Sequence, residues 1–482
     1  MKDHVARVRR SVVKILTTSD PPNYDQPWQT MGSESAHGSG CIVSTKRGLR
    51  VLTNAHVVEN PVFVVCRRFG RAHKFVAQVE GVGHVCDLAL LTVEDETIFD
   101  GCVPVEIGDL PVLGDDVTVL GYPIGGDRLS ITQGVVSRIE MAHYAQSQRR
   151  LLAVQIDAAI NAGNSGGPVI RDDKLVGVAF QALDEGQNIG YMIGAPVVQH
   201  FLQDMESGTF DGFPELGVAI QTLESNAHRE YLGLPRKPRN GVLITDVAFG
   251  GSAWKQLCVG DVLMKVAGTA IAYDGSVRFR RGERIDYSHI VAQHHVGETI
   301  EVGVLRKGEE VTVQVPLSPP RPLVEENRYD VMPTYFTYAG LLFVPLTRDY
   351  LGTWGDDWWT EAPHDLMSSY LSGLRSEEVQ EIVVLQKVLA DQVNVGYHDW
   401  ESQIVSRVGD TSLTCFEDLI AAVEACNEEF ICFHMSDGHT LVIDRKKADK
   451  RASSILRRFG IPSARNTGER STSRTRTDPV QR

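Results

Sequence analysis

Residues 157–168 read DAAINAGNSGGP, in which three glycines and a proline surround a single serine, Ser165. Segments rich in Val, Ile and Leu flank this stretch, so it predicts a tight loop between two β-strands. Glycine adopts backbone angles that other residues avoid, which lets the amides of such a loop point at one place. We therefore expect Gly163, Asn164 and Ser165 to form a cradle for an oxygen that becomes negatively charged beside the Ser165 hydroxyl.

A serine hydroxyl is a weak nucleophile unless a base takes its proton. His56 lies at the end of an apolar strand, in LTNAHVV at residues 52–58, and is the candidate general base. Asp87 opens the apolar segment DLALL at residues 87–91 and is the candidate carboxylate that orients the imidazole. The chain order His, Asp, Ser is that of chymotrypsin-like double barrels and differs from the order in subtilisin-like and α/β-hydrolase enzymes. The sequence thus predicts that His56, Asp87 and Ser165 are catalytic.

Three blocks together resemble the signature of the HtrA/Deg family of serine proteases: TNAH at 53–56, DLALL at 87–91 and GNSGGP at 163–168. Taken singly, a glycine-rich turn, a histidine beside apolar residues and an aspartate before a strand are more often structural, so the three blocks in order carry the argument. The resemblance covers residues 11–205 and implies a trypsin-like serine endopeptidase that needs no metal or organic cofactor. It also implies that Asn188, Ile189 and Gly190 shape a specificity pocket for a small or medium apolar side chain. Ala162 stands where the family usually has proline, which leaves the rigidity of the loop open.

The segment that follows the protease-like region looks like a PDZ domain. Its blocks are ELGVAI at 215–220, GVLITDV at 241–247 and VGDVLMKVAG at 259–268. A Leu-Gly-Val loop that opens a strand offers consecutive amides to the carboxylate of a peptide, while the strand edge pairs with the peptide backbone. Leu216, Gly217 and Val218 are the candidates for this loop, and C-terminal peptides are the expected ligands. An ordinary apolar strand start is the alternative.

Composition divides the chain into four parts. SGTFDGFP at 207–214 and PLSPPRP at 316–322 are the candidate linkers. We expect a trypsin-like serine protease domain at 1–210, a first PDZ domain at 211–318, a second PDZ-like domain at 327–446 and a basic disordered tail at 447–482. The expected fold is mainly β: a chymotrypsin-like double β-barrel followed by two PDZ-like α+β domains.

The second PDZ-like domain shows a fainter resemblance, through GLLF at 340–343 and IVSRVGD at 404–410. A Trp-rich insertion with Trp354, Trp358 and Trp359 interrupts it, and local packing is the expected role of these side chains. This organisation resembles that of the plant-type Deg proteases, and its groove is a candidate for assembly rather than for substrate capture.

Composition and charge limit the partners and the compartment. The net charge of −14 argues against nucleic acid as a partner, although the basic tail leaves nucleic-acid binding open as an alternative to a solvated spacer. No apolar run reaches the ~18 residues of a membrane span, and the N-terminus does not read as a secretory signal. The eight cysteines contain no C-x-x-C pair, so neither a zinc nor a redox site is expected. We expect reduced, mostly buried thiols in the cytoplasm or another reducing compartment, unless an upstream targeting segment was removed.

The expected function is ATP-independent cleavage of unfolded or damaged proteins through an acyl-enzyme on Ser165, regulated by peptide binding at the first PDZ domain. The family resemblance implies a homotrimer or a multiple of it, with Tyr24 and Trp28 as candidate interface aromatics. Two alternatives stay open: a chaperone-like holdase, and a peptide-sensing scaffold whose protease site rests in an inactive form. The sequence gives residue identities and not the geometry of the loop around Ser165.

Overall fold

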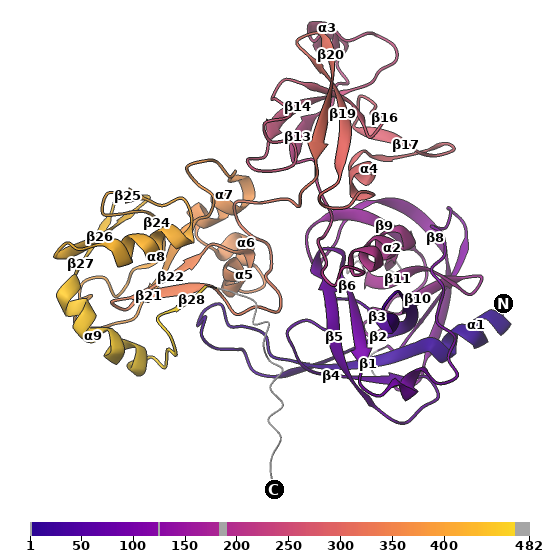
Figure 1. Cartoon of the computed structure of the whole chain (residues 1–482), viewed down its shortest axis with the longest axis horizontal. Coiled ribbons are helices and arrows are strands. Elements are labelled where there is room, and N and C mark those ends of the chain that lie inside the picture. The colour runs from indigo at the N-terminus through magenta and orange to yellow at the C-terminus, as the bar shows by residue number, and fades with distance from the viewer. Residues whose placement is uncertain (1, 124–125, 183–189, 468–482) are drawn as a thin grey trace. The chain divides into compact units, whose positions relative to one another are not determined.

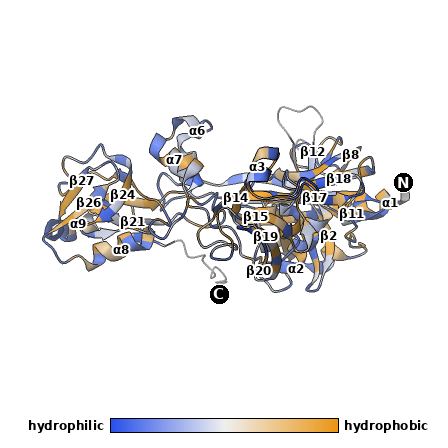
Figure 2. Ribbon diagram, turned by 90° about the horizontal axis from the view of Figure 1, so that it is seen from above, coloured by the Kyte–Doolittle hydropathy of each residue, from blue (hydrophilic) through white to orange (hydrophobic). Residues whose placement is uncertain are grey.

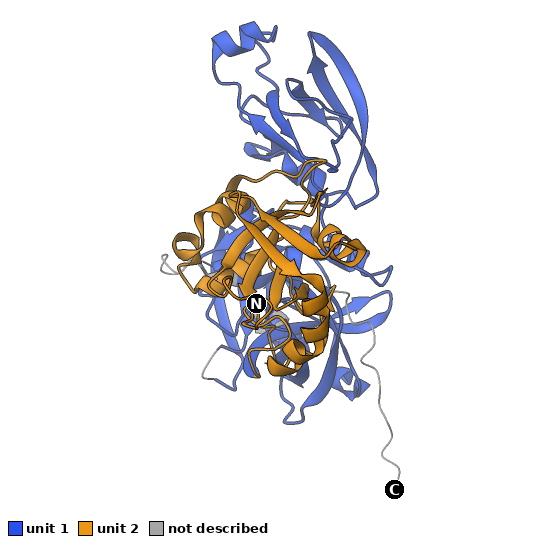
Figure 3. Ribbon diagram, turned by 90° about the vertical axis from the view of Figure 1, so that its left-hand side faces the viewer, with its two compact units in different colours: residues 1–19, 34–320 blue, residues 20–33, 321–482 orange. Residues whose placement is uncertain are grey.

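The computed structural model describes residues 2–123, 126–182 and 190–467, and Figure 1 shows their secondary structure. The chain divides into two compact units, coloured in Figure 3. The N-terminal unit is Met1–Ser19 with Glu34–Pro320, and the C-terminal unit is Asp20–Ser33 with Arg321–Arg482.

The N-terminal unit begins with a closed barrel of six strands. In spatial order these are β1 (Val12–Ser19), β2 (Glu34–Thr45), β3 (Gly48–Thr53), β6 (Leu88–Val93), β5 (Phe75–Gly83) and β4 (Pro61–Arg68). Short helices accompany them: α1 (Lys2–Val8), η1 (Arg9–Ser11), η2 (His84–Cys86) and η3 (Glu96–Phe99). Ile15, Ile42 and Leu91 are fully buried inside this barrel, because β-branched and leucine side chains on its inner face exclude water.

A second closed barrel follows along the chain. Its strands, in spatial order, are β10 (Pro168–Arg171), β11 (Lys174–Ala182), β12 (Gly190–Gly194), β9 (Arg150–Ile156), β8 (Ser130–His143) and β7 (Asp116–Gly121). Helix α2 (Ala195–Asp204) then begins with Pro196 in its first turn, where a missing N–H leaves no helical bond unmade. The two barrels confirm the chymotrypsin-like double-barrel fold.

The third part of the N-terminal unit is a small α+β module. Its sheet has the order β13 (Val218–Gln221), β14 (Val242–Val247), β15 (Val262–Val266), β19 (Thr299–Arg306) and β20 (Glu309–Pro316), with β16 (Thr269–Ala270) beside β15. The remaining elements are α3 (Asn226–Tyr231), the hairpin β17 (Ser276–Arg280) and β18 (Glu283–Asp286), and α4 (Ser288–Ala292). Strand β13 stands at the end of this sheet and pairs with β14 alone among the described strands.

The C-terminal unit is built on one larger sheet. Its order is β27 (Thr440–Asp444), β26 (Phe430–Met435), β24 (Glu401–Val408), β23 (Val383–Val388), β22 (Leu341–Pro345), β21 (Tyr335–Tyr338) and β28 (Arg465–Asn466), with β25 (Thr411–Ser412) beside β24. The helices are α5 (Arg348–Leu351), η4 (Gly352–Trp354), α6 (Trp358–Glu361), α7 (His364–Ser372), α8 (Phe416–Ala425) and α9 (Arg445–Arg458). Hydrophobic and hydrophilic residues share its strands (Figure 2), as in sheets with one buried face.

The expectation of a disordered tail from residue 447 onward is wrong for its first part. Helix α9 occupies Arg445–Arg458, with Asp444 capping it through a bond from the Lys447 amide. Ala448 and Ile455 are buried, and Arg451 donates two hydrogen bonds to Asp391. A few apolar residues on one face suffice to dock a helix that is otherwise basic. The prediction of disorder rested on the average composition of the tail, which does not show where its apolar residues lie. Residues 468–482 of the predicted tail lie outside the described residues.

Residues 20–33, which we call the arm, connect β1 to β2 but belong to the C-terminal unit and not to the predicted 1–210 domain. Gln386 donates hydrogen bonds of 3.0 Å to the carbonyls of Tyr24 and Asp25. The ring of Trp28 meets that of Tyr335 edge-on at 5.9 Å between centroids. Tyr24 and Trp28, expected as subunit-interface aromatics, are thus partly buried against the C-terminal unit, and their role at an interface stays a prediction.

All eight cysteines lie in the described ranges and are free thiols. Cys41, Cys66 and Cys86 are buried, whereas Cys258 is exposed and the other four are partly exposed, so burial is less general than the sequence suggested. Among the described residues, every helix is too short or too polar to cross a membrane.

The aromatic stack under the C-terminal sheet generates a stability prediction. Phe343 is fully buried and stacks on Phe433 with ring centroids 5.1 Å apart. Phe343→Ala should cost about 3–5 kcal/mol of unfolding free energy, because it leaves a cavity that its neighbours fill only partly. Denaturation followed by tryptophan fluorescence reports on this unit, since every tryptophan except Trp254 belongs to it.

The matched control is Phe430→Ala, because Phe430 lies in β26 of the same sheet and is 50% exposed. We expect it to cost about 1 kcal/mol or less. Equal losses in the two variants would contradict the burial of Phe343.

Candidate active site

His56 and Asp87 are held together at two points. His56 lies three residues beyond the end of β3, and its ring Nδ1 is 2.8 Å from Oδ2 of Asp87. The backbone amide of His56 donates to the other oxygen, Oδ1 of Asp87, at 3.0 Å. This second bond fixes the carboxylate against the histidine backbone, so the ring keeps Nδ1 toward Asp87 and turns Nε2 away from it.

An unusual backbone conformation positions the side chain of Asp87. Asp87 has φ 53, in the left-handed region that aspartate tolerates better than most side chains, and it is 1% exposed. Asn54 donates from Nδ2 to the Asp87 carbonyl at 2.7 Å. These contacts place the carboxylate under the imidazole before any substrate arrives.

Ser165 lies in a loop that is tied to the first barrel by Ser39 of β2. The Ser39 amide donates to the Ser165 carbonyl at 2.8 Å, and the Ser39 hydroxyl donates to the Gly163 carbonyl at 2.7 Å. Gly166 has φ 82, and a Cβ there would lie 2.1 Å from the Ser39 carbonyl oxygen, so only glycine fits. The glycine that follows Ser165 is therefore what lets the two barrels approach so closely.

The loop keeps two amides available for an anionic oxygen. Gly163 has φ 94, and neither its amide nor that of Ser165 donates a hydrogen bond to another described residue. The Asn164 amide instead donates to the Asn161 carbonyl at 2.9 Å inside the turn. Three residues were predicted to donate hydrogen bonds to the anionic oxygen. Of these, Asn164 does not offer its backbone amide, because that amide is already bonded to the Asn161 carbonyl.

Ser165 and His56 are not yet hydrogen-bonded to each other in this structure, although both are described. The Ser165 hydroxyl donates to the Phe180 carbonyl at 3.4 Å instead. Catalytic hydrogen bonds are often long or poorly aligned without substrate, so the pairing of Ser165 with His56 stays a prediction.

Comparison with known proteins identifies the family. The trypsin-like peptidase domain family matches residues 38–178, and the PDZ domain family matches residues 324–468. "Protease Do-like 2, chloroplastic" of Arabidopsis thaliana is 38% identical over 469 residues, which cover 96% of this chain and 76% of that protein. This chain belongs to the HtrA/Deg family of Do-like serine proteases.

Two further comparisons agree. "Protease Do-like 4, mitochondrial" of the same plant is 36% identical over 455 residues, which cover 94% of this chain and 84% of that protein. The solved structure "HtrA-type protease AlgW with tripeptide" has a TM-score of 0.51 and 26% identity, and it covers 66% of this chain and 97% of its own. The chain is therefore a serine endopeptidase with trypsin-like and PDZ domains. Its plant relatives are named for the chloroplast and the mitochondrion, so the expected cytoplasmic compartment stays a prediction.

A second carboxylate, that of Glu59, affects the pKa of His56. Burial lowers the pKa of His56, but the charge and hydrogen bond of Asp87 together with the charge of Glu59 outweigh it and raise the pKa above the usual histidine value. Glu59 accepts a 2.7 Å hydrogen bond from Gln146. Burial raises the pKa of Glu59, and this bond and the charge of His56 oppose that rise.

The predicted specificity pocket is only partly described. Asn188 and Ile189 lie outside the described residues, whereas Gly190 begins β12 and is buried. A Cβ at Gly190 would come within 2.6 Å of the Ile160 side chain, so a larger residue at position 190 would displace Ile160.

The predicted peptide loop of the first PDZ module precedes the open edge of its sheet. Gly217 has φ 71, a conformation that favours glycine, and Leu216 is buried beneath it. The Leu216 and Gly217 carbonyls accept bonds of 3.0 and 2.8 Å from the amides of Ala253 and Ala248. These bonds fix the loop just before Val218 starts β13.

Two residues near the site were missed by sequence reasoning. Ser39 lies in the Gly-Ser-Gly run at 38–40, and Glu59 lies three residues after His56. The spacing of Glu59 was a usable signal. A carboxylate three residues after His56 comes near the imidazole if the chain turns between them. The role of Ser39 depends on contacts with the second barrel, which no local pattern reveals.

The charge of Glu59 generates a pH prediction. Glu59→Gln removes a negative charge that favours protonated His56, so the pKa of His56 should fall. Since the base must be neutral to accept the serine proton, the acid limb of the kcat/KM profile should move to lower pH. The measurement is kcat/KM against pH for a peptide substrate.

Glu94→Gln is the control, because Glu94 is an exposed glutamate bonded to Gln78 and not one of the groups that shift the pKa of His56. Its profile should match that of the unmodified enzyme. An acid limb that stays in place in Glu59→Gln would refute the electrostatic role of Glu59.

Proposed function

We propose that this protease cleaves unfolded or damaged proteins without ATP, with Ser165 as nucleophile, His56 as general base and Asp87 as the orienting carboxylate. The two-point hold of Asp87 on His56 carries this proposal, with its 2.8 and 3.0 Å contacts. A carboxylate bonded to Nδ1 selects the tautomer whose free Nε2 accepts a proton, and it stabilises the imidazolium that results.

The chemistry follows from that tautomer. The Ser165 Oγ attacks the substrate carbonyl carbon while Nε2 of His56 takes the hydroxyl proton. The carbonyl oxygen becomes an oxyanion and accepts hydrogen bonds from the amides of Gly163 and Ser165. Collapse breaks the C–N bond, and His56 gives its proton to the leaving amine. Water then attacks the acyl-enzyme by the same route and restores Ser165.

We infer a pocket for a small or medium apolar side chain, shaped by Asn188, Ile189 and Gly190. Support comes from Gly190 at the start of β12, because its lack of a side chain lets the Ile160 side chain pack directly against the backbone there.

We propose that the first PDZ module binds peptides. The loop that receives the C-terminal carboxylate consists of Leu216, Gly217 and Val218. The end position of β13 supports it, because an edge strand has unpaired backbone groups that an extended peptide can complete. The AlgW structure is named as holding a tripeptide, which agrees with this role. In the C-terminal unit the corresponding strand β22 is flanked by β21 and β23, so we assign no peptide to it.

A homotrimer, or a multiple of it, is our proposal for the assembly, and it rests on family membership. Tyr24 and Trp28 are only partly buried against the C-terminal unit, so they stay the candidate aromatics for the trimer contact. The free thiols support a reducing compartment.

Cleavage of unfolded casein by the unmodified chain and by Ser165→Ala tests the peptidase proposal. We expect cleavage and fluorophosphonate labelling at Ser165 in the former, and a loss of kcat of about 10⁶-fold in the latter. Labelling at another serine would refute the assignment. If the unmodified chain neither cleaves nor labels, even with C-terminal peptides present, the holdase and scaffold alternatives become the better account.

Peptide binding is tested with two forms of one peptide, one with a free C-terminal carboxylate and one with an amide. Because the loop amides bond the charged carboxylate, the amidated form should bind at least about tenfold more weakly in calorimetry. Equal affinities would show that the carboxylate is not recognised by the loop.

A further inference from the structure

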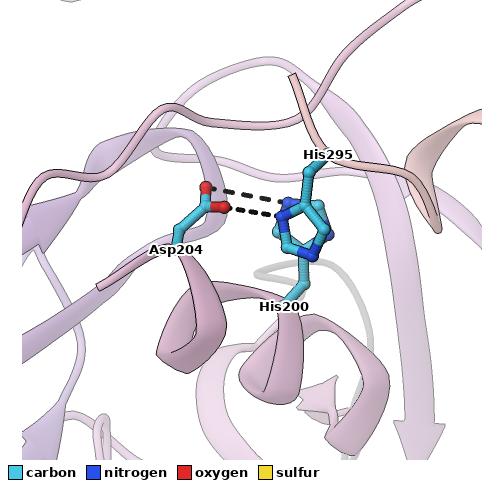
Figure 4. Close-up of side chains that lie close together, drawn as sticks. All are labelled: His200, Asp204 and His295. Atoms are coloured by element: carbon cyan, nitrogen blue, oxygen red, sulfur yellow. Dashed lines mark hydrogen bonds and ion pairs between the residues drawn. The ribbon is translucent and has the colours of Figure 1, made fainter. Parts of the chain in front are cut away.

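A cluster of two histidines and one aspartate joins helix α2 to the first PDZ module (Figure 4). His200 and Asp204 are four residues apart on α2 and therefore lie on the same helix face. His295 comes from the connection between α4 and β19. Both parts belong to the N-terminal unit.

The donor atoms of this cluster converge. Nδ1 of His295 is 2.6 Å from Oδ1 of Asp204, and Nε2 of His200 is 3.8 Å from Oδ2 of Asp204. One donor atom from each residue lies within 4.8 Å of the other two. Tetrahedral zinc with nitrogen and oxygen ligands needs donors about 3.3 Å apart, so the set is close to that size.

Surrounding groups hold the donors in place. Nε2 of His295 faces Oε1 of Gln203 at 3.2 Å, the kind of oxygen partner that orients a metal-bound imidazole through its other nitrogen. Oδ2 of Asp204 accepts a 3.2 Å bond from the Gly212 amide. The His200 ring is stacked between Phe213 and His295, each at 4.0 Å between centroids.

We propose that His200, Asp204 and His295 form a binding site for a divalent transition metal of the zinc class. Two imidazole nitrogens and one carboxylate oxygen are ligands that zinc favours, and three protein ligands leave a fourth position for water. A cavity of about 270 Å³ borders the cluster, with His200 and Gln203 in its lining, and supplies room for that water.

Metal entry requires two changes. Nε2 of His200 lies 3.3 Å from the Gly212 carbonyl oxygen, and it must give up that hydrogen bond to present its lone pair to an ion. The second change is a turn of one ring. The two rings now lie nearly parallel, 22° apart, and an ion must lie in the plane of each imidazole that binds it. His295 is 29% exposed whereas His200 is 5% exposed, so His295 is the ring that turns. The ion then takes the place of the proton between Asp204 and His295.

The site would be structural rather than catalytic. It would tie the last helix of the protease domain to the module that carries the open edge of β13, and so restrict movement between them. The proposal does not depend on the peptidase mechanism, and its test needs no substrate.

The experiment titrates Zn²⁺ into the full chain carrying Ser165→Ala, which prevents self-cleavage, and measures stoichiometry and affinity by calorimetry. We expect one zinc ion per chain, and an affinity weakened about 100-fold or more in His295→Gln and in Asp204→Asn. His294→Gln is the matched control, because the neighbouring His294 bonds Glu298 and is not one of the proposed ligands. It should bind zinc like its parent.

Co²⁺ substitution identifies the donor type. We expect visible d–d bands of a nitrogen and oxygen site with no thiolate charge-transfer band, and circular dichroism of the metal-free variants should match the parent. The proposal is overturned if no zinc binds, if His295→Gln and Asp204→Asn bind as well as the parent, or if a thiolate band places the ion on a cysteine such as the exposed Cys258.

Discussion

The position of Ser39 is the constraint on which the active site depends. The residues of the site are divided between the barrels, because His56 and Asp87 come from the first and Ser165 from the second. Ser39 of β2 is fully buried and donates to the carbonyls of both Gly163 and Ser165. Its hydroxyl also accepts the Tyr122 amide, next to the end of β7. Ser39, through its amide and its hydroxyl, thus sets the register between the half of the site that holds His56 and Asp87 and the half that holds Ser165.

The two halves of the site differ in how firmly they are built. Asp87 grips His56 at both carboxylate oxygens, and this contact is complete without substrate. The Ser165 hydroxyl is bonded to Phe180 and must leave that carbonyl to reach His56. Positive φ angles at Gly163 and Gly166 give the loop a shape that other residues could not adopt. Activity can therefore be governed at the loop while the acid-base pair stays assembled.

The sequence was informative where chemistry is local. His56, Asp87 and Ser165 each occur in a short block with its own strand or turn signal, and the double barrel follows from their order and from the strand-length apolar segments. It failed where the deciding contact is remote. The arm at 20–33 reads as part of the first barrel, yet Gln386 and Tyr335 draw it into the C-terminal unit. His295 lies 91 residues from its partner Asp204, so no spacing rule could pair them.

The two PDZ-like modules show how one topology gives different binding capacity. In the first, β13 ends its sheet and its backbone stays available on one side. In the C-terminal unit, β21 folds back on β22 through the turn at Ala339 and Gly340, and β28 adds a further strand beside β21. The backbone groups that would receive a peptide are then satisfied by the chain itself, and an added strand gains nothing there. The arm that docks on this unit starts and ends at paired residues of the first barrel, Ser19 and Glu34, and β2 runs from that pair to Ser39. The C-terminal unit therefore holds the arm of its own chain, whereas the edge of β13 stays open to a peptide.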